Sequence, residues 1–595
     1  MKTLNKQWEL DSIFQGGSTS STFRTFLDEL QQEIGQFNRK LETITAPFTV
    51  HDAEAFTQIV MTYEALNKQL NEAGAFVECL SAQNIKDPNA SLANNRTQRL
   101  SAELDACTSL FENMLRQISD SNWNGLLQNG DLKEVQFALR EKRELSRKKL
   151  GSDQEQLISG LAVDGYHAWE DLYYSLIGKM EITIDRNGKK EKISVSQANN
   201  LIDDSDRSVR RTAFDALESA WSENADLFAA TLNHIAGFRI AVYKARGWDN
   251  IIDEPLDYNR MSEQTLTTMW AAVDHYKPKL ATFMKRKAEL LKLEKLSWFD
   301  VDAPLTQSSE KLTYEDAAEF IMQHFGSFNP SMASFAKQAL EKRWIEAENR
   351  ANKRPGGFCT NFPISEQSRI FMTFSGTASN RSTLAHELGH AYHQSLMNRL
   401  PYLSQNYAMN VAETASTFSE MIVSDAAKSA AKTKEERIAF LSDKLERCVA
   451  LLMNIHARFL FETRFYEERK QGVVGVERLN QLMTDAEREA YLDTLDVYHP
   501  TFWASKLHFY ITNWPFYNFP YTFGFLFSTG IYVQALQEGP AFAEKYNALL
   551  RDTGRMTTEQ LAQQHLGVDL TKPDFWSSAL DYLMRDVDEF LELTK

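Results

Sequence analysis

The stretch His386-Glu387-Leu388-Gly389-His390 constrains this chain more than any other part of its sequence. On a helix, residues four apart lie one above the other on the same face, so both imidazoles can bind one metal ion. Two imidazoles with this spacing suit tetrahedral zinc, and Glu387 is placed to take a proton from a zinc-bound water. The motif therefore predicts a metal-carrying helix, provided that the chain supplies a third ligand.

The composition favours helix over sheet. Glycine (25 residues) and proline (14 residues) are scarce in a chain of 595, and long stretches are rich in Ala, Leu, Glu, Lys and Gln. Apolar residues recur at three- and four-residue spacing in several segments, which predicts amphipathic helices. These segments are 23–41, 52–80, 90–117, 132–147, 205–242 (one or two helices) and 263–291.

Two regions carry strand signals instead. Asn187-Gly188 lies between the alternating runs 181–184 and 192–195, which is typical of a β-hairpin. Residues 354–363 and 369–374 predict two short strands just before the metal helix, for which Ser382-Thr383 is the expected N-cap. A strand in that place offers an edge to which a peptide could add.

Charge and cysteine content exclude several classes of protein. The formal net charge is −16, and no basic stripe is present, so binding to nucleic acid is not expected. The four cysteines are scattered without a C-x-x-C pair, which argues against a disulfide framework and against a cysteine zinc site. We find no apolar run of 18 residues and no signal peptide, so we expect a cytoplasmic protein that does not engage membranes.

The third metal ligand must come from outside the first motif. His393 shares the face of His386 and His390, but three ligands along one straight helix do not converge on one ion. We therefore interpret His393 as a residue that supports the ligands or packs. Glu413, Glu420 and Asp425 are the other candidates, and a carboxylate from the following helix would complete a His₂Glu site with one open position.

The residues around both motifs resemble a known family. Residues 383–391 together with Val411-Ala412-Glu413-Thr414-Ala415-Ser416-Thr417 resemble the oligoendopeptidase F branch of the thimet-oligopeptidase metallopeptidase family. The opening residues 8–14, residues 357–359 and the segment 508–521 are similar to that family as well. The resemblance thus extends in blocks over nearly the whole chain, and the zinc motif is its most specific part.

The resemblance implies roles for particular residues. Glu413 corresponds to the third zinc ligand, and Glu420 to a carboxylate that supports the ligands, a role that would suit the second N–H of a metal-bound histidine. A histidine and tyrosines of the C-terminal segment stabilise the oxyanion in the family, which assigns that role here to His508 and to tyrosines among Tyr510, Tyr517 and Tyr521. Residues 511–515 make this segment longer than the family norm, so the tyrosine that faces the metal stays open.

The sequence and the resemblance together predict a zinc-dependent oligoendopeptidase that holds one Zn²⁺ ion and hydrolyses short peptides. We expect a mostly α fold with two helical lobes enclosing a deep substrate channel and a small β-sheet beside the zinc helix. The expected domains are an N-terminal helical lobe over residues 1–195, ending in the hairpin, and a catalytic domain over residues 196–595. The oligomeric state is not predicted.

Two alternatives stay open at this point. A zinc carboxypeptidase or aminopeptidase would use the same ligands with a charged anchor for one peptide terminus, and no sequence feature identifies such an anchor. A helical binding protein with a degenerate site is disfavoured by the intact ligand set. The same ligands would also accept Mn²⁺ or Co²⁺.

Overall fold

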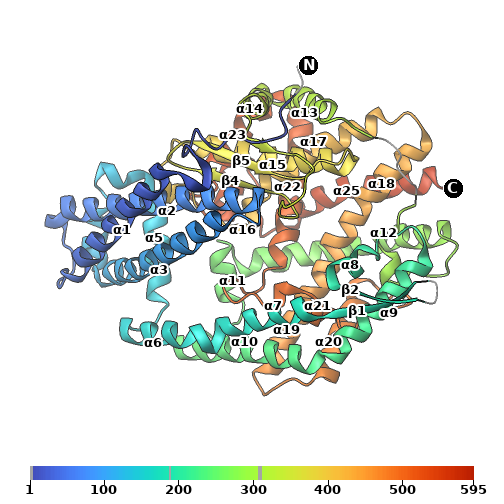
Figure 1. Ribbon diagram of the computed structural model, residues 1–595, viewed down its shortest axis with the longest axis horizontal. Coiled ribbons are helices and arrows are strands. Elements are labelled where there is room, and N and C mark those ends of the chain that lie inside the picture. Colours follow the sequence, from blue (N-terminus) through green and yellow to red (C-terminus); the bar gives the residue numbers. More distant parts are fainter. Residues whose placement is uncertain (1–3, 187–188, 306–310) are drawn as a thin grey trace. The chain divides into compact units, whose positions relative to one another are not determined.

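The computed structural model describes residues 4–186, 189–305 and 311–595, and most of its regular structure is helical (Figure 1). Within these residues the strands form one two-stranded and one three-stranded sheet. The predicted mostly α fold is therefore confirmed, and the small sheet beside the metal helix is present. The deep substrate channel stays a prediction.

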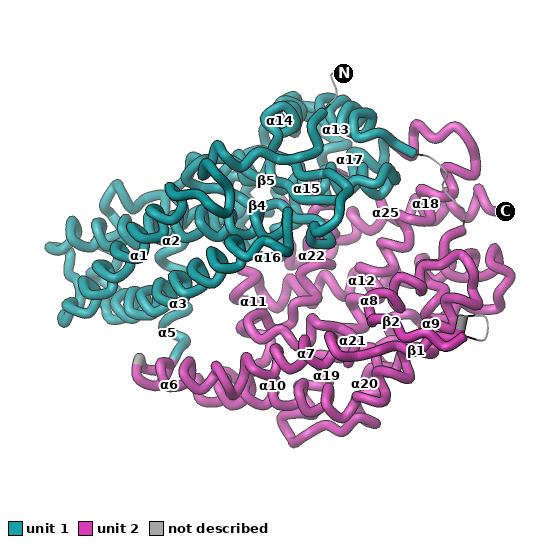
Figure 2. Tube along the Cα trace, in the orientation of Figure 1, with its two compact units in different colours: residues 1–149, 310–426, 534–567 teal, residues 150–309, 427–533, 568–595 magenta. Residues whose placement is uncertain are grey.

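The chain divides into two compact units, each assembled from three separate segments (Figure 2). The first unit comprises residues 1–149, 310–426 and 534–567, and the second comprises residues 150–309, 427–533 and 568–595. The boundary expected at residue 195 does not coincide with these limits, and it stays a prediction about domains.

The N-terminal helices of the first unit follow the apolar periodicity of the sequence. Side chains cap two of their starts: Ser20 accepts a hydrogen bond from the Phe23 N–H, and Asp87 caps the helix that opens with Pro88. Their apolar faces share one core, in which Phe56 and Phe76 are fully buried. The helices are α1 (Ser21–Glu42), α2 (Ala53–Gln83), α3 (Pro88–Gln117), α4 (Asp120–Leu126) and α5 (Gln136–Arg147).

The three-stranded sheet of the first unit has the order β3-β5-β4. Strand β5 (Gln367–Phe371) lies at its centre, parallel to β3 (Ile345–Glu346) and antiparallel to β4 (Phe358–Phe362). Helix α15 (Ala378–Met397), which carries the H-E-x-x-H motif, packs against β4 and β5. The predicted strands are thus confirmed, and β4 forms an edge of the sheet.

The start of α15 corrects one expectation. The helix is capped by Thr377 and not by Ser382-Thr383, because the Thr377 side chain accepts a hydrogen bond from the Asn380 N–H and helical backbone already begins at Ala378. The remaining helices of this unit are α13 (Tyr314–Phe328), α14 (Pro330–Glu341), α16 (Met409–Ala412), α17 (Thr414–Ala430), α23 (Phe542–Asp552) and α24 (Thr558–Leu566). Of these, α13, α14 and α23 pack against α15.

The second unit contains the predicted hairpin, formed by β1 (Glu181–Arg186) and β2 (Lys189–Ser194) in antiparallel register. Its expected turn, Asn187-Gly188, lies outside the described residues. The predicted segment 205–242 forms two helices that break at Asn224. The helices are α6 (Ser152–Ala162), α7 (Ala168–Lys179), α8 (Val195–Asn200), α9 (Arg207–Glu223), α10 (Ala225–Arg246), α11 (Asp253–Tyr258), α12 (Glu263–Leu290), α18 (Lys434–Val449), α19 (Ile455–Arg469), α20 (Val476–Ala490), α21 (Phe502–Ser505), α22 (Phe519–Glu538) and α25 (Pro573–Leu593).

Among the helices of the described residues, none combines the length and the apolar composition that crossing a bilayer requires.

Candidate metal centre

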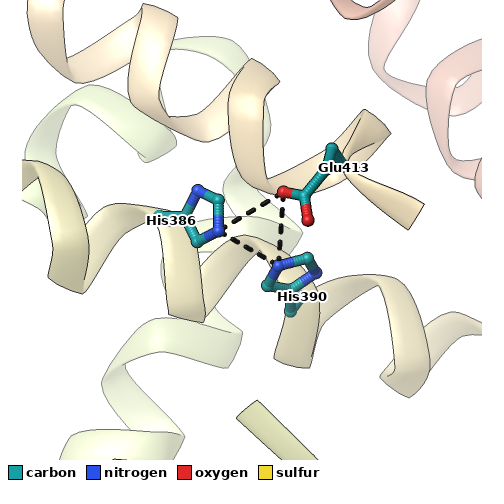
Figure 3. A group of neighbouring side chains, drawn as sticks. All are labelled: His386, His390 and Glu413. Carbon is teal, nitrogen blue, oxygen red and sulfur yellow. Dashed lines mark hydrogen bonds and ion pairs between the residues drawn. The ribbon is translucent and has the colours of Figure 1, made fainter. Parts of the chain in front are cut away.

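Three side chains of the first unit converge on one point (Figure 3). Glu413 Oε2 lies 3.4 Å from His386 Nε2 and 3.5 Å from His390 Nε2. The two Nε2 atoms lie 3.1 Å from each other. The predicted ligand set therefore presents one nitrogen or oxygen atom from each residue at nearly equal spacing.

This spacing fits a tetrahedral metal ion. With bonds of about 2.0–2.1 Å, the ligand atoms of a tetrahedral zinc site lie about 3.3 Å apart. The three observed separations, 3.1, 3.4 and 3.5 Å, surround that value. Two imidazoles and one carboxylate are also the donors of many catalytic zinc sites, which leave the fourth position open. The residues present thus fit the metal that the sequence predicts.

The local fold explains why these three residues meet. His386 and His390 are one turn apart on α15, and Glu413 lies at the junction where α16 ends and α17 begins. Gly389 allows the two ligand-bearing segments to approach. A Cβ atom at Gly389 would lie 2.6 Å from the Ala415 carbonyl oxygen and 2.7 Å from Ser416 Cα. Only glycine permits this approach without moving backbone atoms.

Further polar contacts orient two of the ligands. His386 Nδ1 forms a hydrogen bond with Glu420 Oε1. Ser416 Oγ donates a 2.7 Å hydrogen bond to Glu413 Oε2. A carboxylate behind a ligating histidine fixes the ring orientation and raises its basicity. The contact of Ser416 was not foreseen, because serine in a helix has no motif that identifies such a role.

Glu387 has the position and environment of a proton acceptor. Its side chain is 6% exposed, and its Oε2 atom is buried without a hydrogen-bond partner in the described residues. Burial raises the pKa of Glu387 to about 7, while His386 opposes this shift and Glu413 adds to it. A Cβ atom added at Gly357, just before β4, would lie 3.4 Å from Glu387 Oε1. The carboxylate can therefore exchange a proton near neutral pH.

His390 and His393, which follow His386 on α15, are uncharged at neutral pH. Burial lowers the pKa of His390 to about 4, which favours the neutral form that binds metals. His393 is fully buried, and its Nε2 atom lies 3.0 Å from the Leu550 carbonyl oxygen and 2.8 Å from Thr553 Oγ1. Its ring stacks on Tyr407, with centroids 4.5 Å apart. These contacts favour the packing role for His393 over support of the ligands.

The residues expected to stabilise the oxyanion belong to the second unit. The rings of His508, Tyr517 and Tyr521 form a group with centroids 5.8–5.9 Å apart, and all three are half-buried. Tyr510 does not share their exposure. It is completely buried and stacks on Tyr173 with centroids 3.9 Å apart, so its surroundings are those of a core residue.

An H-E-x-x-H helix and a following glutamate that meet at one point are typical of one group of metallopeptidases. The model of peptidase family M3 matches residues 200–582, and that of oligopeptidase F matches residues 115–181. The chain therefore belongs to peptidase family M3 and is a metallopeptidase.

Individual relatives agree along the whole chain. The group B oligopeptidase PepB of Streptococcus agalactiae is 24% identical over 586 residues, which covers 96% of this chain and 94% of the relative. The crystal structure of oligoendopeptidase F from Enterococcus faecium has a TM-score of 0.72 at 20% identity, covering 96% of this chain and 98% of its own. A solved structure from Chlamydophila abortus reaches a TM-score of 0.84 at 18% identity, covering 99% and 98%. The two solved structures share the fold.

Proposed function

We propose that this chain is a zinc-dependent oligoendopeptidase, which cleaves internal bonds of short peptides. The convergence of His386, His390 and Glu413 at separations of 3.1–3.5 Å is the observation that carries the proposal. The oligopeptide specificity follows the names of the relatives, which include an oligopeptidase and an oligoendopeptidase F.

His386, His390 and Glu413 would hold the ion, and Glu420 and Ser416 would keep two of these ligands in orientation. When bound, the zinc ion supplies Lewis-acid activation of a water molecule and of the scissile carbonyl. The neutral state of His390 leaves its lone pair available for the metal at physiological pH.

Glu387 acts as the general base and then as the general acid. Its carboxylate takes the proton of the attacking water and passes it to the amine that leaves. The pKa of about 7 suits both transfers, because the group can accept and release a proton at little cost. Since Glu387 is not a ligand in this scheme, its removal stops the reaction without removing the metal.

His508, Tyr517 and Tyr521 supply hydrogen-bond donors for the oxyanion. The support for this assignment is the family resemblance of their segment, together with the half-buried group that the three rings form. Tyr510 is left out of the proposed set because its ring lies in the core of the second unit.

The test compares wild type with Glu387→Gln on an internally quenched peptide of about ten residues, blocked at both ends. We expect internal cleavage by wild type only, loss of cleavage in chelator, and one zinc ion per chain in both proteins. Trimming of free peptides without cleavage of the blocked one would replace the endopeptidase with an exopeptidase. Full activity of the variant would refute the role of Glu387.

A further inference from the structure

Two basic side chains of the second unit lie close to the same aromatic ring. The Arg458 guanidinium of α19 is 5.2 Å from the centroid of Phe502, and Lys506 Nζ is 4.9 Å from it. Phe502 is buried, whereas both basic side chains are half-buried and reach solvent. Both positive charges thus lie against one aromatic ring at the edge of the core.

Neither cation forms an ion pair with a carboxylate of the described residues. Arg458 donates instead to two neutral amide oxygens, Asn454 Oδ1 at 2.8 Å and Asn518 Oδ1 at 3.2 Å. Asp302 acts on Lys506 only through space and offsets its charge in part.

Two fully buried cations of this unit, Arg210 and Lys287, are neutralised directly. Arg210 lies 2.8 Å from Asp300, and Lys287 lies 2.6 Å from Glu446. Burial of a charge is costly unless an opposite charge accompanies it. Arg458 and Lys506 differ from Arg210 and Lys287 because no carboxylate of the described residues forms an ion pair with them.

The unbalanced charge is evident from neighbouring groups. Burial, together with the positive charge of Arg458 and against the opposing effect of Asp302, lowers the pKa of Lys506 to about 8. Burial likewise lowers the pKa of Arg458 to about 10. His508, which both cations influence, has a pKa of about 4, mainly because of burial. An anion at this place would offset the repulsion between Arg458 and Lys506.

We propose that Arg458 and Lys506 form an anion-binding subsite, which binds a carboxylate of the peptide substrate. A guanidinium and an ammonium are the usual protein ligands of a carboxylate. The formal net charge of the whole chain is −16 and repels anions, so binding of a carboxylate requires a local group of positive charges. The inference rests on the proposed function, because the ligand is a peptide and because His508 is assigned to the reacting carbonyl.

The carboxylate has two possible sources, the C-terminus of the peptide or an acidic side chain. Four peptides built on one neutral parent sequence separate these sources. Two have the parent sequence, one with an amidated and one with a free C-terminus. The other two are amidated and carry one glutamate, either in the N-terminal or in the C-terminal half. Steady-state kinetics with wild type and Lys506→Met give KM and kcat for each peptide. Methionine keeps the apolar stem beside Phe502.

We expect Lys506→Met to raise KM about tenfold for the peptides that carry the recognised carboxylate and to leave the neutral peptide unchanged. Lys285→Met, at an exposed position of α12, is the matched control for the loss of one positive charge. Arg458→Lys, which keeps the charge, tests the fork geometry. The proposal is overturned if wild type does not distinguish the four peptides, or if Lys506→Met affects them equally.

A binding assay separates this inference from the proposed function. Fluorescently labelled versions of the four peptides are titrated with Glu387→Gln and with the double variant Glu387→Gln/Lys506→Met. If the double variant loses affinity only for the peptides with the recognised carboxylate, the subsite is supported, even if wild type cleaves none of the peptides. Equal affinities of both proteins for all four peptides overturn it, whatever the enzyme does.

Discussion

Gly389→Ala tests whether the close approach of α15 and the segment after Glu413 sets the metal centre. The added Cβ would lie 2.6 Å from the Ala415 carbonyl oxygen, 2.7 Å from Ser416 Cα and 2.7 Å from Ser419 Oγ. Two of these three atoms belong to the backbone and cannot rotate away. Ordinary contacts begin near 3.4 Å, so the two segments must separate by about 0.7 Å or more.

The separation has different consequences for stability and for metal binding. Overpacking of this kind costs about 1–3 kcal/mol, and the better helix propensity of alanine returns up to about 1 kcal/mol. The variant should therefore fold with a modest loss of stability. Functional geometry tolerates only about 0.5 Å of displacement, so Glu413 should lose its position opposite the two histidines. We expect zinc affinity to fall by about tenfold or more.

The assay is competition of the protein with a chromophoric chelator for zinc, combined with thermal unfolding of the metal-free form. Gly74→Ala is the control, because Gly74 lies within α2 of the same unit and a Cβ there meets no atom within 4 Å. This control should keep wild-type zinc affinity and gain up to about 1 kcal/mol of stability. Wild-type affinity in Gly389→Ala would refute the reasoning.

Two further substitutions probe single contacts. Ser416→Ala removes the 2.7 Å hydrogen bond to Glu413 and should weaken zinc binding about tenfold in the same competition assay, whereas Ser419→Ala, whose hydroxyl is buried without a partner in the described residues, should not. Glu462→Gln tests a buried carboxyl whose Oε1 accepts the Phe516 N–H and whose pKa burial raises to about 7. Because this folded-state pKa exceeds the ordinary value of 4.5, wild-type stability should fall as the pH rises from 4.5 through 7, by up to about 3 kcal/mol. Denaturant unfolding at pH 5 and pH 8 should show the variant gaining on wild type only at the higher pH, and parallel curves would contradict this.

The parts of the structure that short-range patterns determine were predictable from the sequence. The spacing of His386 and His390 fixes their common helical face, and the periodicity of the N-terminal segments gives α1 to α3 within a few residues. The helix cap at Thr377 was missed because Ser382 and Thr383 have the same capping chemistry nearer to the motif. Both sites read alike in a sequence, and only the backbone distinguishes them.

Contacts between distant segments could not be derived in this way. The first unit joins segments that are hundreds of residues apart, and nothing in the apolar pattern of one segment names its partner. Even within one of these segments, the close approach of Gly389 to Ala415 depends on how two helices pack, which the sequence pattern does not show. The tyrosines illustrate the same limit. Tyr510 and Tyr517 occur in one aromatic segment, but only the position of Tyr173 shows that Tyr510 is a core residue.

The charge state of His508 links the proposed oxyanion donors to the proposed anion-binding subsite. With a pKa of about 4, His508 is neutral at physiological pH, so in its proposed role it would act on the oxyanion as a hydrogen-bond donor and not as a cation. A neutral imidazole can donate its N–H without first being protonated, but it stabilises a negative charge less than an imidazolium ion would. Arg458 and Lys506 favour this neutral state, because their positive charges oppose protonation of the ring. Their proposed role is confined to the substrate carboxylate, so Lys506→Met should raise KM for an anionic peptide and leave the kinetics of the neutral peptide unchanged.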